Sequence, residues 1–229
     1  MRKAAIGLLA NIVCIAMFGQ AKEFEGIVVY KVDVKSKIEG VGDKAWKNML
    51  ALGDSMTVMI KQGNYRQSTG ITDIYLITKD EKAYFRFKGI DTLFYVDYSS
   101  DTSTVLNISR AEEKKSVAGF ECRPITIRTK AITRKYYYSP SLYMNPEYDK
   151  NNRIGRYDVF AKETSSLYLS AFEDNESYTT SYTCTRLQQG PVEKNVFDLP
   201  KLPQKIFRLS LLPHSQHSRG EEDLINICS

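Results

Sequence analysis

The feature that most constrains the fold is a series of short segments in which apolar and polar side chains alternate, each bounded by turn residues. Such alternation has the two-residue period of a half-buried β-strand. The 15 Tyr and 10 Phe residues also favour strands. The sequence therefore predicts a mainly β chain of hairpins in series, with strands over residues 24–34, 55–61, 65–68, 73–78, 82–88, 92–98, 122–129, 134–139, 166–173 and 178–187.

One segment has a helical pattern instead. Asp43 is a candidate N-cap, Trp46 and Met49 recur at helical spacing, and Gly53 supplies a stop signal. We predict a helix over 43–52 that covers the sheet. The alternative is that the helix plugs a hydrophobic groove.

Residues 1–21 have the pattern of a secretory signal peptide, with a basic start and an apolar run. Gly19 and Ala21 are small residues at the two positions that a signal peptidase recognises. A membrane anchor is the alternative, but the run is shorter than the roughly 20 apolar residues that a span needs, and Asn11 interrupts it. A lipoprotein anchor at Cys14 is a further alternative, although no small residue directly precedes that cysteine. The pattern predicts an exported mature chain without a transmembrane segment.

Charge and motifs exclude several function classes. The chain has 32 basic and 27 acidic residues, a net charge of +5. The basic residues are spread along the sequence, which predicts no nucleic-acid partner. Residues 22–203 contain no histidine, no nucleophile elbow, no phosphate-binding loop and no metal-ligand cluster. We therefore predict a non-catalytic protein without cofactor or metal.

Export also bears on the cysteines, because disulfides persist outside the cytoplasm. Cys122 and Cys184 both lie in strand-like segments, and we predict a disulfide between them. The alternative is two unpaired, semi-buried thiols.

Two regions lack strand alternation. Residues 139–156 are rich in Pro, Asn and Gly, which predicts a long ordered loop that either covers a cavity mouth or packs on the surface. Residues 204–229 carry His214, His217 and Cys228, and we expect a poorly ordered tail there. Two imidazoles three residues apart are a weak metal signal without acidic or cysteine partners.

Three motifs carry a resemblance to a known family. They are the start KEFEGIVVY at 22–30, the central KKSVAGFEC at 114–122, where Gly119 stands at a bend or bulge, and the closing NVFDLP at 195–200. Together they resemble a family of exported proteins of Gram-negative bacteria whose fold is similar to that of the Lol lipoprotein carriers and receptors. The resemblance covers residues 22 to about 203, which we expect to form one domain.

The resemblance implies a curved antiparallel sheet that forms an open half-barrel, with one or few helices over its concave face and lipid chains bound between. It also implies a location in the periplasm or at the outer membrane. The expected function is the binding of a lipid or acyl chain; the alternative is an envelope scaffold that has a filled core and a protein partner. The groove would be lined by Val28, Tyr30, Trp46, Met49, Phe85, Phe87, Phe94 and Val96.

Overall fold

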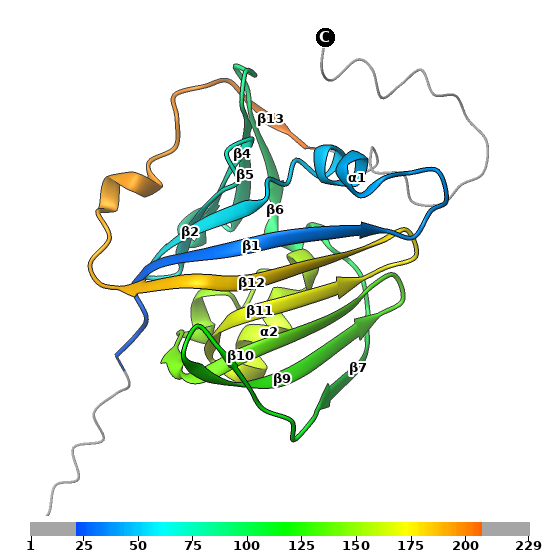
Figure 1. Cartoon of the computed structure of the whole chain (residues 1–229). Helices are drawn as coiled ribbons and strands as arrows, with labels where there is room; N and C mark the ends of the chain where they lie inside the picture. The colour runs from blue at the N-terminus through cyan, green and yellow to red at the C-terminus, as the bar shows by residue number, and fades with distance from the viewer. Residues whose placement is uncertain (1–21, 208–229) are drawn as a thin grey trace, which may run out of the picture.

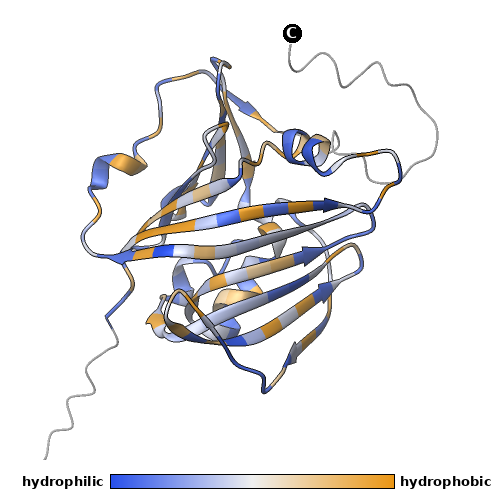
Figure 2. Ribbon diagram, in the orientation of Figure 1, coloured by the Kyte–Doolittle hydropathy of each residue, from blue (hydrophilic) through white to orange (hydrophobic). Residues whose placement is uncertain are grey.

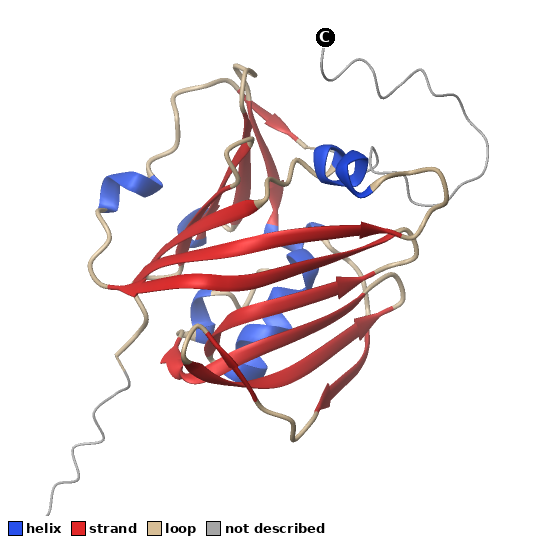
Figure 3. Ribbon diagram, viewed as in Figure 1, coloured by secondary structure: helices blue, strands red, loops and turns tan. Residues whose placement is uncertain are grey.

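A computed structural model describes residues 22–207, and these form one open sheet of 13 strands with two α-helices (Figures 1 and 3). From edge to edge the strands run β13-β6-β5-β4-β3-β2-β1-β12-β11-β10-β9-β7, and β8 pairs with β9 outside this path. The elements are β1 (Gly26–Ser36), α1 (Asp43–Met49), β2 (Ser55–Lys61), β3 (Asn64–Ser68), β4 (Thr72–Ile77), β5 (Lys82–Phe87), β6 (Leu93–Asp97), β7 (Val105–Arg110), β8 (Lys115–Val117), β9 (Phe120–Thr129), β10 (Thr133–Tyr143), α2 (Tyr157–Thr164), β11 (Ser166–Asp174), β12 (Tyr178–Gln189) and β13 (Gln204–Ile206).

The centre of the sheet is β1, which pairs with β2 on one side and with β12 on the other. Strands β2 to β6 form one antiparallel meander, and β9 to β12 form a second. Pairing of β1 with β12 therefore joins the two meanders across more than a hundred residues of sequence. In the described chain, the pairing of β13 with β6 is parallel.

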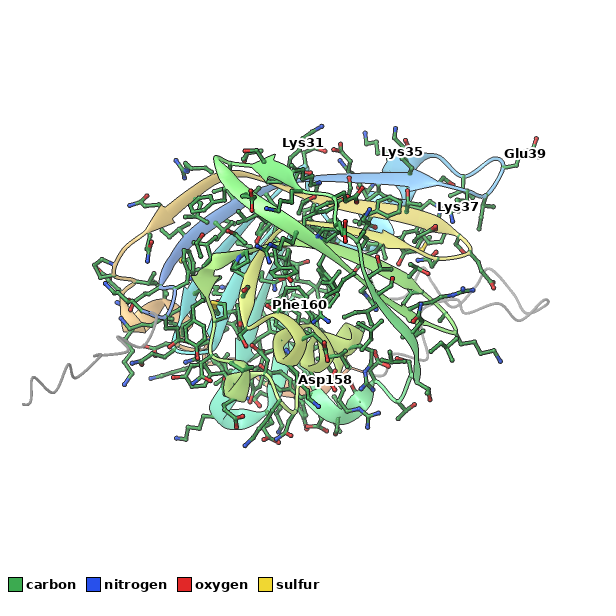
Figure 4. The ribbon with its side chains drawn as sticks, turned by 90° about the horizontal axis from the view of Figure 1, so that it is seen from below. Lys31, Lys35, Lys37, Glu39, Asp158 and Phe160 are labelled. Atoms are coloured by element: carbon green, nitrogen blue, oxygen red, sulfur yellow. The ribbon has the colours of Figure 1, made fainter. Side chains whose placement is uncertain are left out.

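The sheet is curved, and the curvature sets the position of the core. Strands β1 and β12 form the back of the curve, while β2 to β6 and β9 to β11 turn toward the same side (Figure 1). Seen from below, the sheet arches over α2, and Phe160 points from that helix toward the sheet (Figure 4). Lys31 and Lys35 lie on the opposite, outer side. The mainly β, open half-barrel expected from the sequence is confirmed.

Side-chain alternation accounts for most of these strands. Hydrophobic and polar residues alternate along β1 and β9 (Figure 2). Along β2, Met56, Val58 and Ile60 are buried, whereas Ser55 is exposed. Along β1, the buried residues Val28, Tyr30 and Val32 face the core. The bounds predicted for β2 agree with the structure, and most other predicted strands differ by a few residues.

The helices differ from the sequence prediction. Trp46 of α1 is buried against Tyr178, with 4.7 Å between ring centroids, and its indole N–H donates to Ser36 Oγ at 3.1 Å. That helix therefore packs at the end of β1 and β12, at the rim of the concave face, where its Met49 reaches the cavity. The sequence analysis missed α2, which places Phe160 against Tyr136 with 4.5 Å between centroids. This second helix covers the concave face.

Two smaller predictions are also corrected. Ala118 and Gly119 have positive φ values of 51° and 84° and form the two-residue turn of the β8–β9 hairpin, so Gly119 is a turn residue and not a bend within a strand. Residues 139–156 do not form one long loop, because β10 continues to Tyr143 and short 3₁₀ turns follow at Pro146–Tyr148 and Ile154–Arg156.

The predicted disulfide is absent from the structure. Cys122 on β9 and Cys184 on β12 are both buried and both free, and β10 and β11 stand between their strands in the sheet. Burial raises the pKa of both thiols, with Cys184 at about 11, which keeps them protonated. Both side chains pack in the same hydrophobic cluster. They serve this structure as small apolar core residues.

The ends of the chain are only partly described. Residues 204–206 form β13, so the sheet extends past the boundary expected at Pro203. The predicted leader, with Cys14, and the residues His214, His217 and Cys228 lie outside the described residues. Within residues 22–207, neither helix has the length and hydrophobicity to span a bilayer.

Candidate ligand-binding cavity

A cavity of about 460 Å³ lies on the concave side of the sheet. One wall comes from β2 to β6, and the other comes from β10 to β12. Two further segments complete the lining. One is the stretch directly after α1, and the other is residues 152–157, which lead into α2. Sheet curvature therefore brings together two meanders that are distant in sequence, and the space between them is not filled by side chains.

The wall from β2 to β6 is mostly apolar, and its polar side chains, which include Gln67 and Thr72, carry no charge. Alternation along β2 turns the buried side chains Met56, Val58 and Ile60 toward the cavity. The facing parts of β4 and β5 contribute further aliphatic and aromatic groups, including Ile74, Leu76, Ala83, Phe85 and Phe87. Such a surface attracts apolar ligands through area removed from water and carries no directional chemistry.

The structure brings five of the predicted groove residues to the cavity and leaves three elsewhere. Tyr30, Met49, Phe85, Phe87 and Val96 line the cavity.

The other three predicted residues have structural contacts. Val28 is fully buried in the main core cluster. Trp46 packs on Tyr178. Phe94 contacts the rings of Phe87 and Phe207, with centroids 5.9 and 6.0 Å apart. Their hydrophobic character was visible in the sequence, but their distance from the open space was not. Val28 and Phe94 pair directly with the lining residues Val58 and Phe85, so they lie on the same side of the sheet and pack beside the cavity.

Sequence reasoning missed Phe207. This residue follows β13, lines the cavity, and packs against Phe85 with 5.9 Å between centroids. Its backbone N–H donates to the carbonyl of Tyr95 at 2.7 Å, which extends the parallel pairing with β6. No local signal identified it, because a three-residue parallel strand depends on a partner about a hundred residues away.

The opposite wall carries the charged groups of the cavity. Arg134 on β10 and Glu173 on β11 face each other in the register, and Arg134 Nε donates to Glu173 Oε1 at 2.8 Å. Burial disfavours the charged guanidinium and is the largest single effect, but the Glu173 carboxylate, together with Tyr136 and Asp101, outweighs it and raises the pKa of Arg134. Arg134 and Glu173 are the charged residues in the described lining.

Three tyrosines of the lining are close enough to this ion pair for the charge of Glu173 to act on them. They are Tyr136, Tyr168 and Tyr182. Burial is the main cause that raises the pKa of each phenol, and the negative charge of Glu173 raises it further. These hydroxyls therefore stay neutral, and each can donate or accept a hydrogen bond.

A buried carboxyl is hydrogen-bonded to two residues of the cavity lining. Asp149 accepts hydrogen bonds from Tyr65 Oη at 2.8 Å and from Asn152 Nδ2 at 3.3 Å. Tyr65 and Asn152 both line the cavity. Burial raises the pKa of Asp149 to about 6, although these two hydrogen bonds oppose the shift. The protonation of Asp149 is thus linked to two lining residues.

A second hollow lies away from the cavity and is polar. Its lining includes Asp80, Glu81, Asp97, Lys150 and Arg153. Acidic side chains there are mixed with basic ones, and in residues 22–207 no group of three or more His, Cys, Asp or Glu side chains is placed to hold a metal ion. The apolar cavity is therefore the candidate functional site.

Comparisons with known proteins identify no family. No family model matches the chain, and no curated protein sequence matches it. Among solved structures, PNGF-II in two crystal forms covers 80% and 78% of this chain, with 9% identity in each and TM-scores of 0.47 and 0.44. This chain spans about a third of PNGF-II, 32% and 31%. The match to LprF from Mycobacterium bovis covers 74% of this chain and 88% of the LprF chain, with 10% identity and a TM-score of 0.31. All three scores lie below 0.5, so these likenesses carry no argument about function.

Proposed function

We propose that this protein is a non-catalytic binding protein of the cell envelope whose cavity takes up a lipid or acyl chain. The observation that carries the proposal is the cavity of about 460 Å³ between the two meanders. Ligand pockets are typically about 300–1,000 Å³, mostly apolar, with a few polar groups that orient the ligand. This cavity combines an apolar wall with one cluster of polar groups, as such a pocket requires.

The apolar wall supports a chain-like ligand. A chain that buries some 300 Å² gains roughly 7 kcal/mol at about 25 cal/mol per Å², before the cost of ordering the chain and its partner. Because the wall from β2 to β5 offers no charged side chain to the cavity, methylene groups are the ligand chemistry that it favours. Export through the expected leader would place the protein where lipids are moved between membranes.

The alternative is an envelope scaffold that binds a protein partner. That hypothesis expects the concave face to be a filled core, which an internal space of this size does not support. The observation that most favours a protein partner is the exposure of Leu106 and Ile108 on the edge strand β7. We rank it second, because two exposed side chains are a smaller apolar feature than the cavity.

A pair of substitutions tests the binding function. Ile74→Trp places an indole ring in the cavity, whereas Ile108→Trp places the same ring on the exposed face of β7. The assay is titration of the delipidated chain with a fluorescent fatty acyl probe at micromolar concentration. We expect binding by the unsubstituted chain and by Ile108→Trp, and a loss of at least about tenfold in affinity for Ile74→Trp, which corresponds to 1.4 kcal/mol. No binding by the unsubstituted chain would refute the proposal, as would equal binding by the two variants.

A further inference from the structure

The cavity has two chemically different walls, and this difference bears on the head group of the ligand. Resting on the proposed function, we propose that Glu173 is a specificity-determining residue: it makes the polar end of the cavity accept an uncharged head group with hydroxyl or amide groups and reject a free carboxylate. The inference rests on the Arg134–Glu173 ion pair, on a second carboxylate beside it, and on the surrounding tyrosines.

The ion pair leaves no cationic site for an anion. Arg134 is the basic residue in the described lining, and its guanidinium is bound to Glu173 at 2.8 Å. The side chains of Arg134 and Glu173 are 16% and 24% exposed, so water screens their charges only weakly. An anionic head group that approaches Arg134 would also approach Glu173. Repulsion from one charge then offsets attraction to the other.

A second carboxylate strengthens this effect. Asp101 Oδ2 accepts a hydrogen bond from the Gly155 N–H at 3.1 Å, and Gly155 lies in the cavity lining. Burial disfavours the charge on Asp101, but hydrogen bonds from Ser103 and Gly155 and the charge of Arg134 lower its pKa, so it is ionised at neutral pH. Arg134 therefore forms an ion pair with one carboxylate, Glu173, and the charge of a second, Asp101, acts on it at longer range. These two negative charges exceed the single positive charge of Arg134, which disfavours an anionic ligand.

The surrounding groups match a neutral, hydrogen-bonding head group instead. The hydroxyls of Tyr136, Tyr168 and Tyr182 stay protonated because burial and Glu173 raise their pKa values. A glycerol ester or an amide has O–H or N–H groups that can donate to Glu173, and hydroxyl or carbonyl oxygens that can accept from these phenols. A free carboxylate has no proton to donate.

The backbone also favours a fixed position for Arg134. Gly155 has φ of +62°, and a Cβ added there would lie 3.3 Å from Arg134 Cζ. The absence of a side chain lets the 152–157 segment approach the guanidinium closely. Arg134 is thus held between Glu173 and this segment, which limits its freedom to turn toward an incoming anion.

The experiment compares two ligands that share one acyl chain. A monoacylglycerol and the corresponding free fatty acid each compete with the fluorescent acyl probe for the full chain at pH 8, where the acid is ionised. We expect the monoacylglycerol to compete better. In Glu173→Gln, the free guanidinium favours the carboxylate, so the fatty acid should gain about tenfold or more relative to the monoacylglycerol.

Two further variants are the controls. Asp174→Asn removes the same charge from the next residue, but Asp174 pairs with Lys37 at the surface and is not part of the cavity lining. Glu173→Asp keeps the negative charge. We expect both variants to retain the preference of the unsubstituted chain, which would separate a local effect of Glu173 from a change in net charge.

Each outcome bears on one proposal or the other. Equal competition by the two ligands in the unsubstituted chain would overturn the head-group inference and leave the binding function standing. An equal loss of both ligands in Glu173→Gln would assign Glu173 a structural role only. If Glu173→Gln does not fold, the comparison of the two ligands in the unsubstituted chain still decides. The acyl probe carries an uncharged head group, so its failure to bind would refute the proposed function itself and could not be caused by rejection of a carboxylate.

Discussion

Asp149 should make the stability of this protein depend on pH in an unusual direction. Most carboxyls in folded proteins are stabilised as anions, but Asp149 is 2% exposed, and burial raises its pKa from 3.8 to about 6. The folded state therefore binds this proton more tightly than the unfolded state does. Its contribution to stability is present below pH 3.8 and is lost as pH rises through 6.

The magnitude follows from the two pKa values. Each tenfold difference in proton affinity is worth 1.36 kcal/mol, so a change from 3.8 to about 6 lowers the free energy of unfolding by about 3 kcal/mol above pH 7. Asp149→Asn removes this titration. Its amide can still accept from Asn152 Nδ2 and can donate to Tyr65 Oη, so we expect the variant to gain up to about 3 kcal/mol at pH 7.5 and nothing at pH 4.

Urea unfolding at a series of pH values measures the effect. With an m-value of about 1–3 kcal/mol per M, the midpoints of variant and parent should differ by roughly 1 M or more at pH 7.5 and converge near pH 4. Burial raises the pKa of Glu23 as well, and the charge of Glu23 contributes to the raised pKa of Asp149, so the measured difference includes this coupling. Asp43→Asn is the control, because a hydrogen bond from Lys35 lowers the pKa of that exposed carboxyl. Parallel profiles for Asp149→Asn and the parent would refute the reasoning.

Two further predictions concern the core. Phe160→Ala should lower the free energy of unfolding by about 3–5 kcal/mol, because this fully buried ring holds α2 against the sheet. The control Phe172→Ala, at a residue 41% exposed, should lower it by less than about 1 kcal/mol. Similar losses for both variants in urea unfolding would show that α2 does not pack on the concave face. Cys122 and Cys184 should resist alkylation in the native protein and react in urea without reductant, and peptide mass spectrometry that finds them bridged would contradict the free thiols.

The sequence determined the class of fold because each strand has its own pattern. Alternation of Met56, Val58 and Ile60 with polar residues placed β2 correctly, since a two-residue period is a local property of the chain. The same holds in part for α1, which begins at Asp43, although its N-cap is Gly42 and not the predicted Asp43, and it ends at Met49 and not at residue 52. Cavity residues such as Phe85 and Phe87 were found for this reason, as aromatic members of one alternating face.

Only the tertiary structure decided which apolar residues meet at the cavity. A period of two separates the faces of a strand, but it does not say which part of the inner face borders the open space. Val28 and Phe94 share that face with their register partners Val58 and Phe85, which line the cavity, but they pack beside it. The parallel pairing of β13 with β6 brings Phe207 to the cavity, and α2 depends on the tyrosines that surround Phe160.

The ion pair between Arg134 and Glu173 likewise exists only in the register of β10 with β11, because strand pairing sets which polar residues face each other across the sheet. Local patterns thus determined the strands of this protein. Contacts between distant segments decided the cavity, because curvature and register are properties of the whole sheet.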